Sequence, residues 1–159
     1  MTTRFQNFMP FIFKWEGGYD NDPDDPGGET NFGIDKRSHP GEDIKHLTKE
    51  RAAEIYFSDY WTPLRCEELP KGVGEVVMNI GVNAGKGRAA RWLQEECGAT
   101  VDGQIGPQTI DHACRTLNLA EALLDRTEGH YRSIAKGKLA KFLKGWLNRN
   151  NDLRALVSK

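Results

Sequence analysis

Residues 15–34 read WEGGYDNDPDDPGGETNFGI, a stretch in which we expect an amphipathic helix to end and an acidic loop to begin. Upstream of it, apolar residues recur at three- and four-residue steps, which is typical of an amphipathic helix. We expect that helix to end at Gly17 and Gly18, because glycine favours helix termination. Glu16 is then its last residue, where the helix dipole disfavours a carboxylate. An apolar, dipole-negative setting favours the neutral acid, which is the form that a general acid needs.

The rest of the pattern predicts a mainly α fold. Pro10 lies inside the first helix and is expected to kink it or mark a restart. A short β-hairpin is expected around residues 30–34. Further helices are predicted from the N-cap Thr48, over 73–80, over 88–97, from Pro107, from Asn118 in a capping box with Glu121, and over 139–147 and 153–157. With no repeat or low-complexity linker, we expect one helical domain.

The net charge of −1 conceals an asymmetry between the two halves of the chain. Residues 1–75 hold nine Lys/Arg against fifteen Asp/Glu, whereas residues 76–159 hold thirteen against eight. An acidic part packed against a basic part explains this, and a basic face suits an anionic polymer such as a cell wall. Two differently solvated surfaces explain it equally well. The basic half lacks the aromatic and Arg/Lys patterning of a nucleic-acid reader, so no nucleic-acid partner is expected.

Targeting signals and cofactor motifs are not found. The three cysteines have no CxxC spacing, so we interpret them as reduced, mostly buried thiols. The N-terminus has no secretory signal pattern, and no apolar run approaches the length of a membrane span. We therefore expect synthesis in the cytoplasm, no integral membrane segment and no cofactor. A substrate outside the inner membrane then requires a separate release route.

The acidic loop invites comparison with a calcium site. Asp20, Asp22 and Asp24 have the 1-3-5 spacing of such a loop. The sixth position is Asp25 rather than glycine, and the twelfth is Asn31 rather than glutamate. We therefore predict no metal site.

The same loop suits glycoside hydrolysis, which needs a protonated acid and usually a second carboxylate. Glu16 is the candidate acid, and Asp25, nine positions on, is the candidate second carboxylate. Thr30 and Asn31 follow with small polar groups that can position a water. An Asx turn at Asp25 is an equally good interpretation. Asp22 and Asp24 are interpreted as turn residues, although either can replace Asp25.

Glutamate, eight residues, aspartate and then threonine resemble the arrangement in phage-type lysozymes. Five residues separate the aspartate from the threonine in those enzymes, whereas four separate Asp25 from Thr30 here. The longer string resembles glycoside hydrolase family 108, a group of bacterial and phage peptidoglycan-degrading proteins. It matches at Glu16–Tyr19, Asp22–Pro23, Asp25–Gly28, Thr30–Asn31 and Gly33–Ile34.

The second half resembles the predicted peptidoglycan-binding region that accompanies this family. Segments 77–85, 92–94, 102–109 and 142–149 carry that likeness. The resemblance implies a lysozyme-like α+β fold with Glu16 as the catalytic acid. It also implies a catalytic part over residues 1–72 and a binding region over 73–159, packed into the same globule.

Several further side chains are candidates for substrate contact. Tyr19 and Tyr60 can stack on sugar rings, and Asn83 can hydrogen-bond a sugar acetamido group or cap the preceding helix. Trp61, Trp92 and Trp146 are interpreted as core residues. The basic run Lys136, Lys138, Lys141 and Lys144 is interpreted as a solvated helix face, with contact to an anionic cell wall as the alternative.

We hypothesise a monomeric murein hydrolase that cleaves β-1,4 bonds of the glycan strand. Glu16 protonates the glycosidic oxygen, Asp25 stabilises positive charge or activates water, and Thr30 helps to place that water. One alternative is a lytic transglycosylase that uses Glu16 alone. Another is a non-catalytic cell-wall-binding or secretion-assisting protein. An endolysin of a phage or prophage, released through a separate pore-forming protein, fits the expected absence of a signal peptide.

Overall fold

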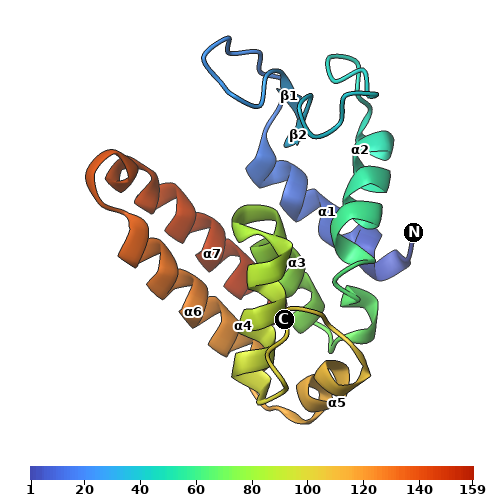
Figure 1. Ribbon diagram of the computed structural model, residues 1–159, viewed down its shortest axis with the longest axis vertical. Coiled ribbons are helices and arrows are strands. Elements are labelled where there is room, and N and C mark those ends of the chain that lie inside the picture. Colours follow the sequence, from blue (N-terminus) through green and yellow to red (C-terminus); the bar gives the residue numbers. More distant parts are fainter. The chain divides into compact units, whose positions relative to one another are not determined.

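The computed structural model describes residues 1–159, which form two compact units, Met1–Asp59 and Tyr60–Lys159. We describe each unit by itself. The predicted mainly α fold with one short antiparallel hairpin is confirmed (Figure 1). The predicted functional division between residues 72 and 73 stays a prediction.

The first unit begins with α1, Thr3–Glu16, whose apolar residues follow helical spacing. Thr2 caps its start, because its side chain accepts the N–H of Phe5 at 3.3 Å. The helix ends at Gly17 as predicted, with a φ of +76°. The predicted restart at Pro10 is wrong, since α1 is continuous and Pro10 is exposed. The buried face of α1 consists of Phe5, Phe8, Met9, Phe11 and Ile12.

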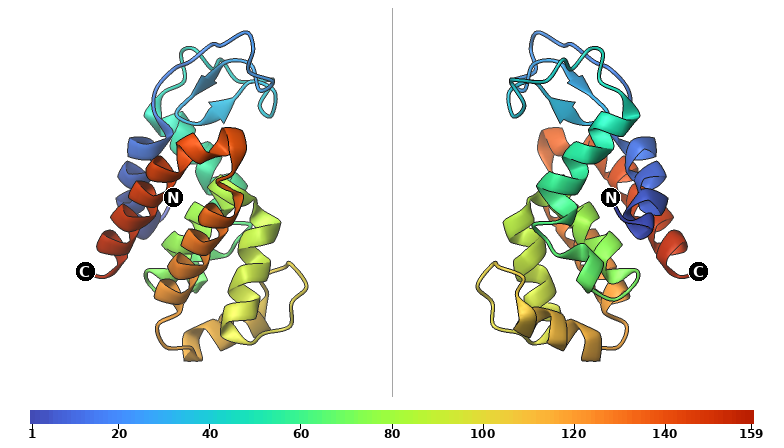
Figure 2. Two further views of the ribbon diagram at one scale, coloured as in Figure 1. Left: turned by 90° about the vertical axis from the view of Figure 1, so that its left-hand side faces the viewer. Right: turned by 90° about the vertical axis from the view of Figure 1, so that its right-hand side faces the viewer.

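A two-stranded hairpin follows the acidic loop. Strand β1, Thr30–Asn31, pairs with β2, Ile34–Asp35, so the hairpin predicted around residues 30–34 is confirmed. The two connecting residues, Phe32 and Gly33, have φ values of 52° and 79°. Positive φ at both central positions is typical of a type I′ turn, whose twist matches that of the flanking strands. The loop between α1 and β1 arches over the hairpin in Figure 2 and forms a bridge between Asp20 and Thr30.

Helix α2, Lys49–Tyr56, completes the first unit. The predicted N-cap is confirmed, because the Thr48 side chain accepts the N–H of Arg51 at 3.1 Å. A π-helical turn, Phe57–Trp61, continues α2 and was not predicted. This turn spans the boundary between the two units.

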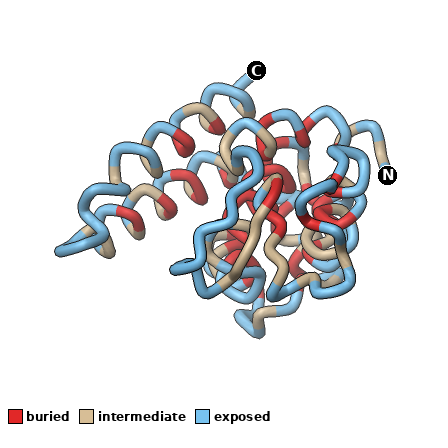
Figure 3. Tube along the Cα trace, turned by 90° about the horizontal axis from the view of Figure 1, so that it is seen from above, coloured by how far each residue is buried: buried red, intermediate tan, exposed pale blue.

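The second unit is helical throughout and is built around α3, Val73–Ala84. Residues 73–81 are all buried and mostly apolar, with Glu75 and Asn79 as the polar exceptions. Buried residues of the chain are drawn red in Figure 3. Helix α3 packs against α4 and α6, while α6 and α7 lie side by side in Figure 1. The helices are α4 (Lys86–Cys97), α5 (Pro107–Arg115), α6 (Leu119–Ile134) and α7 (Leu143–Val157), with 3-10 turns at Cys66–Glu68 (η2) and Gly137–Phe142 (η3).

Two details of the second unit differ from expectation. Asn118 precedes α6, but its φ is +57° and its side chain makes no capping bond, so the predicted capping box with Glu121 is wrong. An N-cap residue needs an extended backbone for its side chain to reach the first N–H groups of the helix, whereas the backbone of Asn118 is left-handed. The two last helices expected from the sequence form one element, α7, after the turn η3.

The predictions for tryptophan and cysteine hold only in part. Trp61 is 1% exposed, as expected for the core, whereas Trp92 and Trp146 are half-buried. All three cysteines are free; Cys66 and Cys97 are buried and Cys114 is exposed. None of the helices combines the length and apolarity that crossing a bilayer requires.

Gln94 organises the turn between α4 and α5 from inside the second unit. Its side chain is fully buried and donates to Asp102 Oδ1 at 2.7 Å and to the Gln104 carbonyl at 2.9 Å. Its Oε1 accepts the N–H groups of Asp102 and Gly103 at 3.1 and 2.9 Å. The single Gln94 side-chain amide therefore provides hydrogen-bond partners for both acceptors and donors of this turn.

Gln94→Leu should lower the free energy of unfolding by about 3 kcal/mol, because it leaves several turn groups without partners. Gln104→Leu is the matched control, since the Gln104 side chain is exposed; it should change stability by less than about 0.5 kcal/mol. Urea denaturation of the two variants measures the difference. Equal stability would contradict the role assigned to Gln94.

Candidate functional site

The Glu16 carboxyl group lies against the turn of the hairpin. A methyl group placed on Gly33 would lie 2.8 Å from Glu16 Oε2 and 3.0 Å from Glu16 Cβ. Glu16 is half-buried and Gly33 is exposed, so the carboxyl group borders solvent. The end of α1 and the hairpin together hold this side chain at an accessible position.

Tyr56 holds the hairpin turn at Phe32 and Gly33 in place. Its hydroxyl donates to the carbonyl oxygen of Phe32 at 2.7 Å. The ring of Phe13 packs edge-on against both Phe32 and Tyr56, with centroids 5.4 and 6.4 Å apart. Because a left-handed backbone is unfavourable for phenylalanine, these contacts stabilise a strained turn. Such strain beside a candidate catalytic acid is a feature of functional sites.

Asp25 closes its own turn. Its Oδ1 accepts the N–H of Gly27 at 2.8 Å, which is the Asx-turn arrangement. Asp25 is exposed, and its second oxygen accepts no hydrogen bond. The same turn chemistry occurs at Asp22, whose Oδ1 accepts the N–H of Asp24 at 2.9 Å. One carboxylate oxygen of Asp25 therefore remains available to a ligand or a water.

Thr30 and Asp35 occupy one face of the hairpin. They are paired across the two strands, and their neighbours Asn31 and Ile34 form the buried face. The backbone of Thr30 is bonded in both directions to Asp20, at 2.7 and 2.8 Å, while its hydroxyl has no partner. Asp35 therefore shares a face with the Thr30 hydroxyl, and the carboxylates of Asp35 and Asp25 both lie near Gly27.

Asn31 and Tyr19 have protein partners instead of open sites. Asn31 is 7% exposed and donates its amide to the Ile44 carbonyl at 3.0 Å, which ties the following loop to the hairpin. Tyr19 is exposed and donates to Glu29 Oε2 at 2.8 Å. That hydrogen bond to a carboxylate raises the pKa of Tyr19. The Tyr19 ring is available for stacking, whereas the Asn31 amide is already used.

Tyr60 and Asn83 belong to the second unit. The ammonium group of Lys86 lies 5.5 Å from the centroid of the Tyr60 ring, within the range of a cation–π contact. Asn83 is exposed at the end of α3 and donates to the Tyr131 hydroxyl at 3.1 Å. The structure thus brings Asn83 to an aromatic side chain that the sequence did not associate with it.

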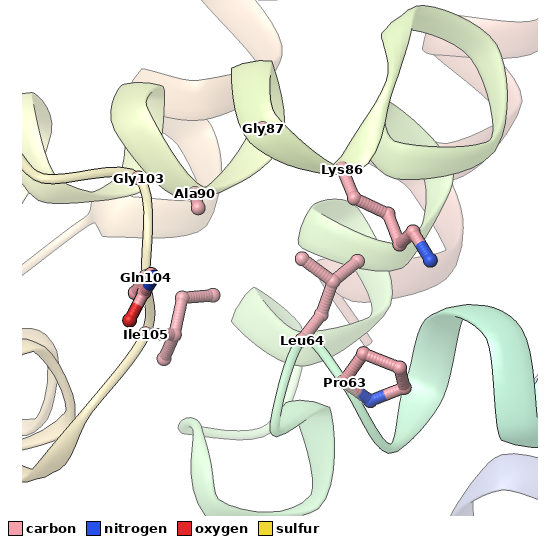
Figure 4. A pocket seen from close by; sticks show the side chains of 8 residues that line it. All are labelled: Pro63, Leu64, Lys86, Gly87, Ala90, Gly103, Gln104 and Ile105. Atoms are coloured by element: carbon pink, nitrogen blue, oxygen red, sulfur yellow. The ribbon is translucent and has the colours of Figure 1, made fainter.

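The second unit also contains a cavity of about 370 Å³, shown in Figure 4. Leu64 and Ile105 project into it, and Lys86 is its charged lining residue. None of the lining residues is a carboxylate or a candidate from the sequence. This cavity therefore offers no carboxylic acid to protonate a glycosidic oxygen.

The sequence did not reveal the roles of three residues in and around the hairpin. Gly33 and Tyr56 shape the turn, and Asp35 faces the same side as Thr30. The signal for Asp35 was present, because residues opposite each other in a two-residue hairpin share a face. The contact of Tyr56 is formed between distant segments, which local patterns do not reveal.

No three His, Cys, Asp or Glu side chains gather closely enough to hold a metal ion. The carboxylates of Asp22 and Asp25 instead accept backbone N–H groups of their own turns.

Comparisons with known proteins give two family matches. The model described as Glycosyl hydrolase 108 matches residues 9–85, and the one described as Predicted Peptidoglycan domain matches residues 88–151. SagA from Brucella abortus, a solved structure, is similar at 31% identity with a TM-score of 0.83. The similarity covers 96% of this chain and 92% of the SagA chain. No curated protein sequence matches.

Gly33→Ala should reduce wall-degrading activity by about 10²-fold, because the new methyl displaces Glu16 and Tyr56. The positive φ should also cost about 1–2 kcal/mol of stability. Gly41→Ala is the matched control, since nothing lies within 4 Å of a methyl group there. Turbidity assays on purified walls measure both variants. A fully active Gly33→Ala enzyme would show that the turn does not position Glu16.

Proposed function

This chain belongs to the glycosyl hydrolase 108 family, and we propose that Glu16 is the general acid with which it cleaves β-1,4 bonds of the glycan strand. The family and the predicted peptidoglycan domain together identify the protein as a peptidoglycan hydrolase. The bond, the acid and the roles of the neighbouring residues are our proposal.

The placement of Glu16 is the observation that carries this proposal. The residue ends α1 inside the segment matched by the hydrolase model, and its carboxyl group packs on the hairpin turn next to solvent. A glutamic acid in this position can approach the oxygen between two sugar rings. Proton transfer to that oxygen lets the bond to the anomeric carbon break, leaving an oxocarbenium-like centre.

Asp25 and Thr30 complete the hydrolytic scheme. The unbonded oxygen of Asp25 can take a proton from a water as that water attacks the anomeric carbon. The Thr30 hydroxyl, which has no protein partner, can orient the water. Asp35 faces the same side as Thr30 and is the alternative base. In this scheme Glu16 supplies one proton and the carboxylate accepts another, so charge is balanced.

One observation favours a second scheme, lytic transglycosylation. Asp25 is held by its own turn, which suits a structural residue as well as a base. In a transglycosylase, the C6 hydroxyl of the substrate's muramoyl residue attacks the anomeric carbon and gives a 1,6-anhydro product. Glu16 protonates the leaving oxygen, and its carboxylate then accepts the proton of that hydroxyl, so no second carboxylate is needed.

We also propose that the protein acts at the cell wall, because peptidoglycan lies outside the cytoplasmic membrane. Release through a separate pore-forming protein is part of this proposal. An endolysin of phage or prophage origin fits this assignment.

Glu16→Gln should lower wall clearing by roughly 10²–10⁴-fold, because an amide cannot donate the proton. A zymogram on embedded cell walls measures this directly. Glu50→Gln is the matched control, since Glu50 lies exposed in the first turn of α2. Its clearing should equal that of wild type. Unchanged clearing by Glu16→Gln would overturn the assignment of the acid.

Asp25→Asn distinguishes the two schemes. Hydrolysis should fall by roughly 10²-fold or more if Asp25 activates water, and mass spectrometry of digested murein should show reducing ends. Asp43→Asn is the control, because Asp43 is an exposed loop carboxylate that pairs with His46 and should keep wild-type activity. Full activity of Asp25→Asn together with 1,6-anhydro ends would replace hydrolysis by transglycosylation.

A further inference from the structure

A second cavity, of about 170 Å³, lies within the second unit. It is formed where the end of α3, the start of α4, the end of α6 and the start of α7 meet. Its principal side chains are those of Asn83, Arg88, His130, Tyr131 and Trp146. This volume is below that of a whole drug-sized site, so it suits one sugar ring of a longer chain.

Aromatic rings form one wall of the cavity. Tyr131 and Trp146 stack with centroids 5.2 Å apart and an angle of 26°. Phe142, which is 46% exposed, extends the stack from Trp146 at 5.8 Å. The C–H bonds of a pyranose are apolar and slightly positive, so they complement aromatic rings. Tyr131 is only 6% exposed and holds Trp146 in place, so the half-buried Trp146 is the ring that a sugar can contact.

Arg88 supplies a cation that no carboxylate neutralises. Its side chain is exposed, forms no ion pair, and lies with Nη1 3.2 Å from His130 Nε2. Burial and the Arg88 charge lower the pKa of His130, so the ring is neutral and accepts this hydrogen bond. Most of the five guanidinium donors remain available for a bidentate contact with a ligand carboxylate.

Asn83 provides a hydrogen-bonding side-chain amide at the rim of the cavity. Its Nδ2 donates to the Tyr131 hydroxyl at 3.1 Å, which fixes the orientation of the amide. Its Oδ1 accepts no bond from the protein and can accept the N–H of an acetamido group. The cavity thus places an acetamido acceptor, a free cation and an aromatic wall together.

We infer that this cavity binds a muramoyl residue, an N-acetylated sugar that carries a carboxylate-bearing substituent. The inference rests on peptidoglycan being the substrate. Asn83 receives the acetamido group, Arg88 the carboxylate, and Trp146 the ring. The carboxylate has two sources: the lactyl ether of a peptide-free muramoyl residue, or the attached peptide.

The larger cavity beside Leu64 is less suited to this ligand, because none of its lining residues is aromatic. Arg88, His130, Tyr131 and Trp146 lie within the segment that matches the predicted peptidoglycan domain. The position of the smaller cavity therefore agrees with the ligand class assigned to it.

Titrations of the full-length ¹⁵N-labelled Glu16→Gln protein test the inference without turnover. The probes are the peptide-free GlcNAc–MurNAc disaccharide, the same disaccharide bearing L-Ala–D-Glu, and neutral chitobiose. The Trp146 indole and Asn83 side-chain amide signals should shift with saturation. Adding Arg88→Gln should weaken an anionic probe about tenfold and leave chitobiose unchanged, as expected for one charge-assisted contact.

Arg115→Gln is the matched control, because Arg115 lies on α5 and pairs with Asp111 outside the cavity. A response confined to the peptide-free probe assigns the carboxylate to the lactyl group, and one confined to the other probe assigns it to the peptide. Unchanged affinity of every probe in Arg88→Gln, or unshifted Trp146 and Asn83 signals, would overturn the inference. Wall clearing by Glu16→Gln is a separate readout, which tests the catalytic acid alone.

Discussion

The hydrogen bond from the Tyr56 hydroxyl to the Phe32 carbonyl is the constraint on which the candidate site depends. It holds a type I′ turn in which a phenylalanine adopts a left-handed backbone. The next residue, Gly33, has no side chain, and this leaves the space that Glu16 occupies. A helix end, a hairpin and a second helix therefore converge on one carboxyl group.

This arrangement explains how a carboxyl group is kept at an electrostatically poor position. The C-terminus of α1 disfavours negative charge, and packing on the hairpin holds the Glu16 side chain there nonetheless. Asp22 and Asp25 in the loop differ, because each accepts a backbone N–H of its own turn.

Local signals in the sequence were sufficient for much of the fold. Helix ends at Gly17, Thr48 and Pro107, and the short hairpin, follow from glycine, capping and proline preferences that act over a few residues. The contacts of Tyr56 and of Arg88 could not be predicted in this way, because their partners are distant in the chain. Asn118 failed for a local reason, since a left-handed backbone replaced the capping geometry.

Whether Glu16 donates the proton to the leaving oxygen is tested by comparing two substrates that differ in their leaving groups. Wild type and Glu16→Gln are compared on a chitooligosaccharide with an ordinary sugar leaving group and on its 2,4-dinitrophenyl glycoside, whose leaving group departs without protonation. The account predicts a rate loss of roughly 10²–10⁴-fold on the first substrate and little loss on the second. Equal losses on both substrates would contradict it, because they would show that Glu16 does not act by protonating the leaving group.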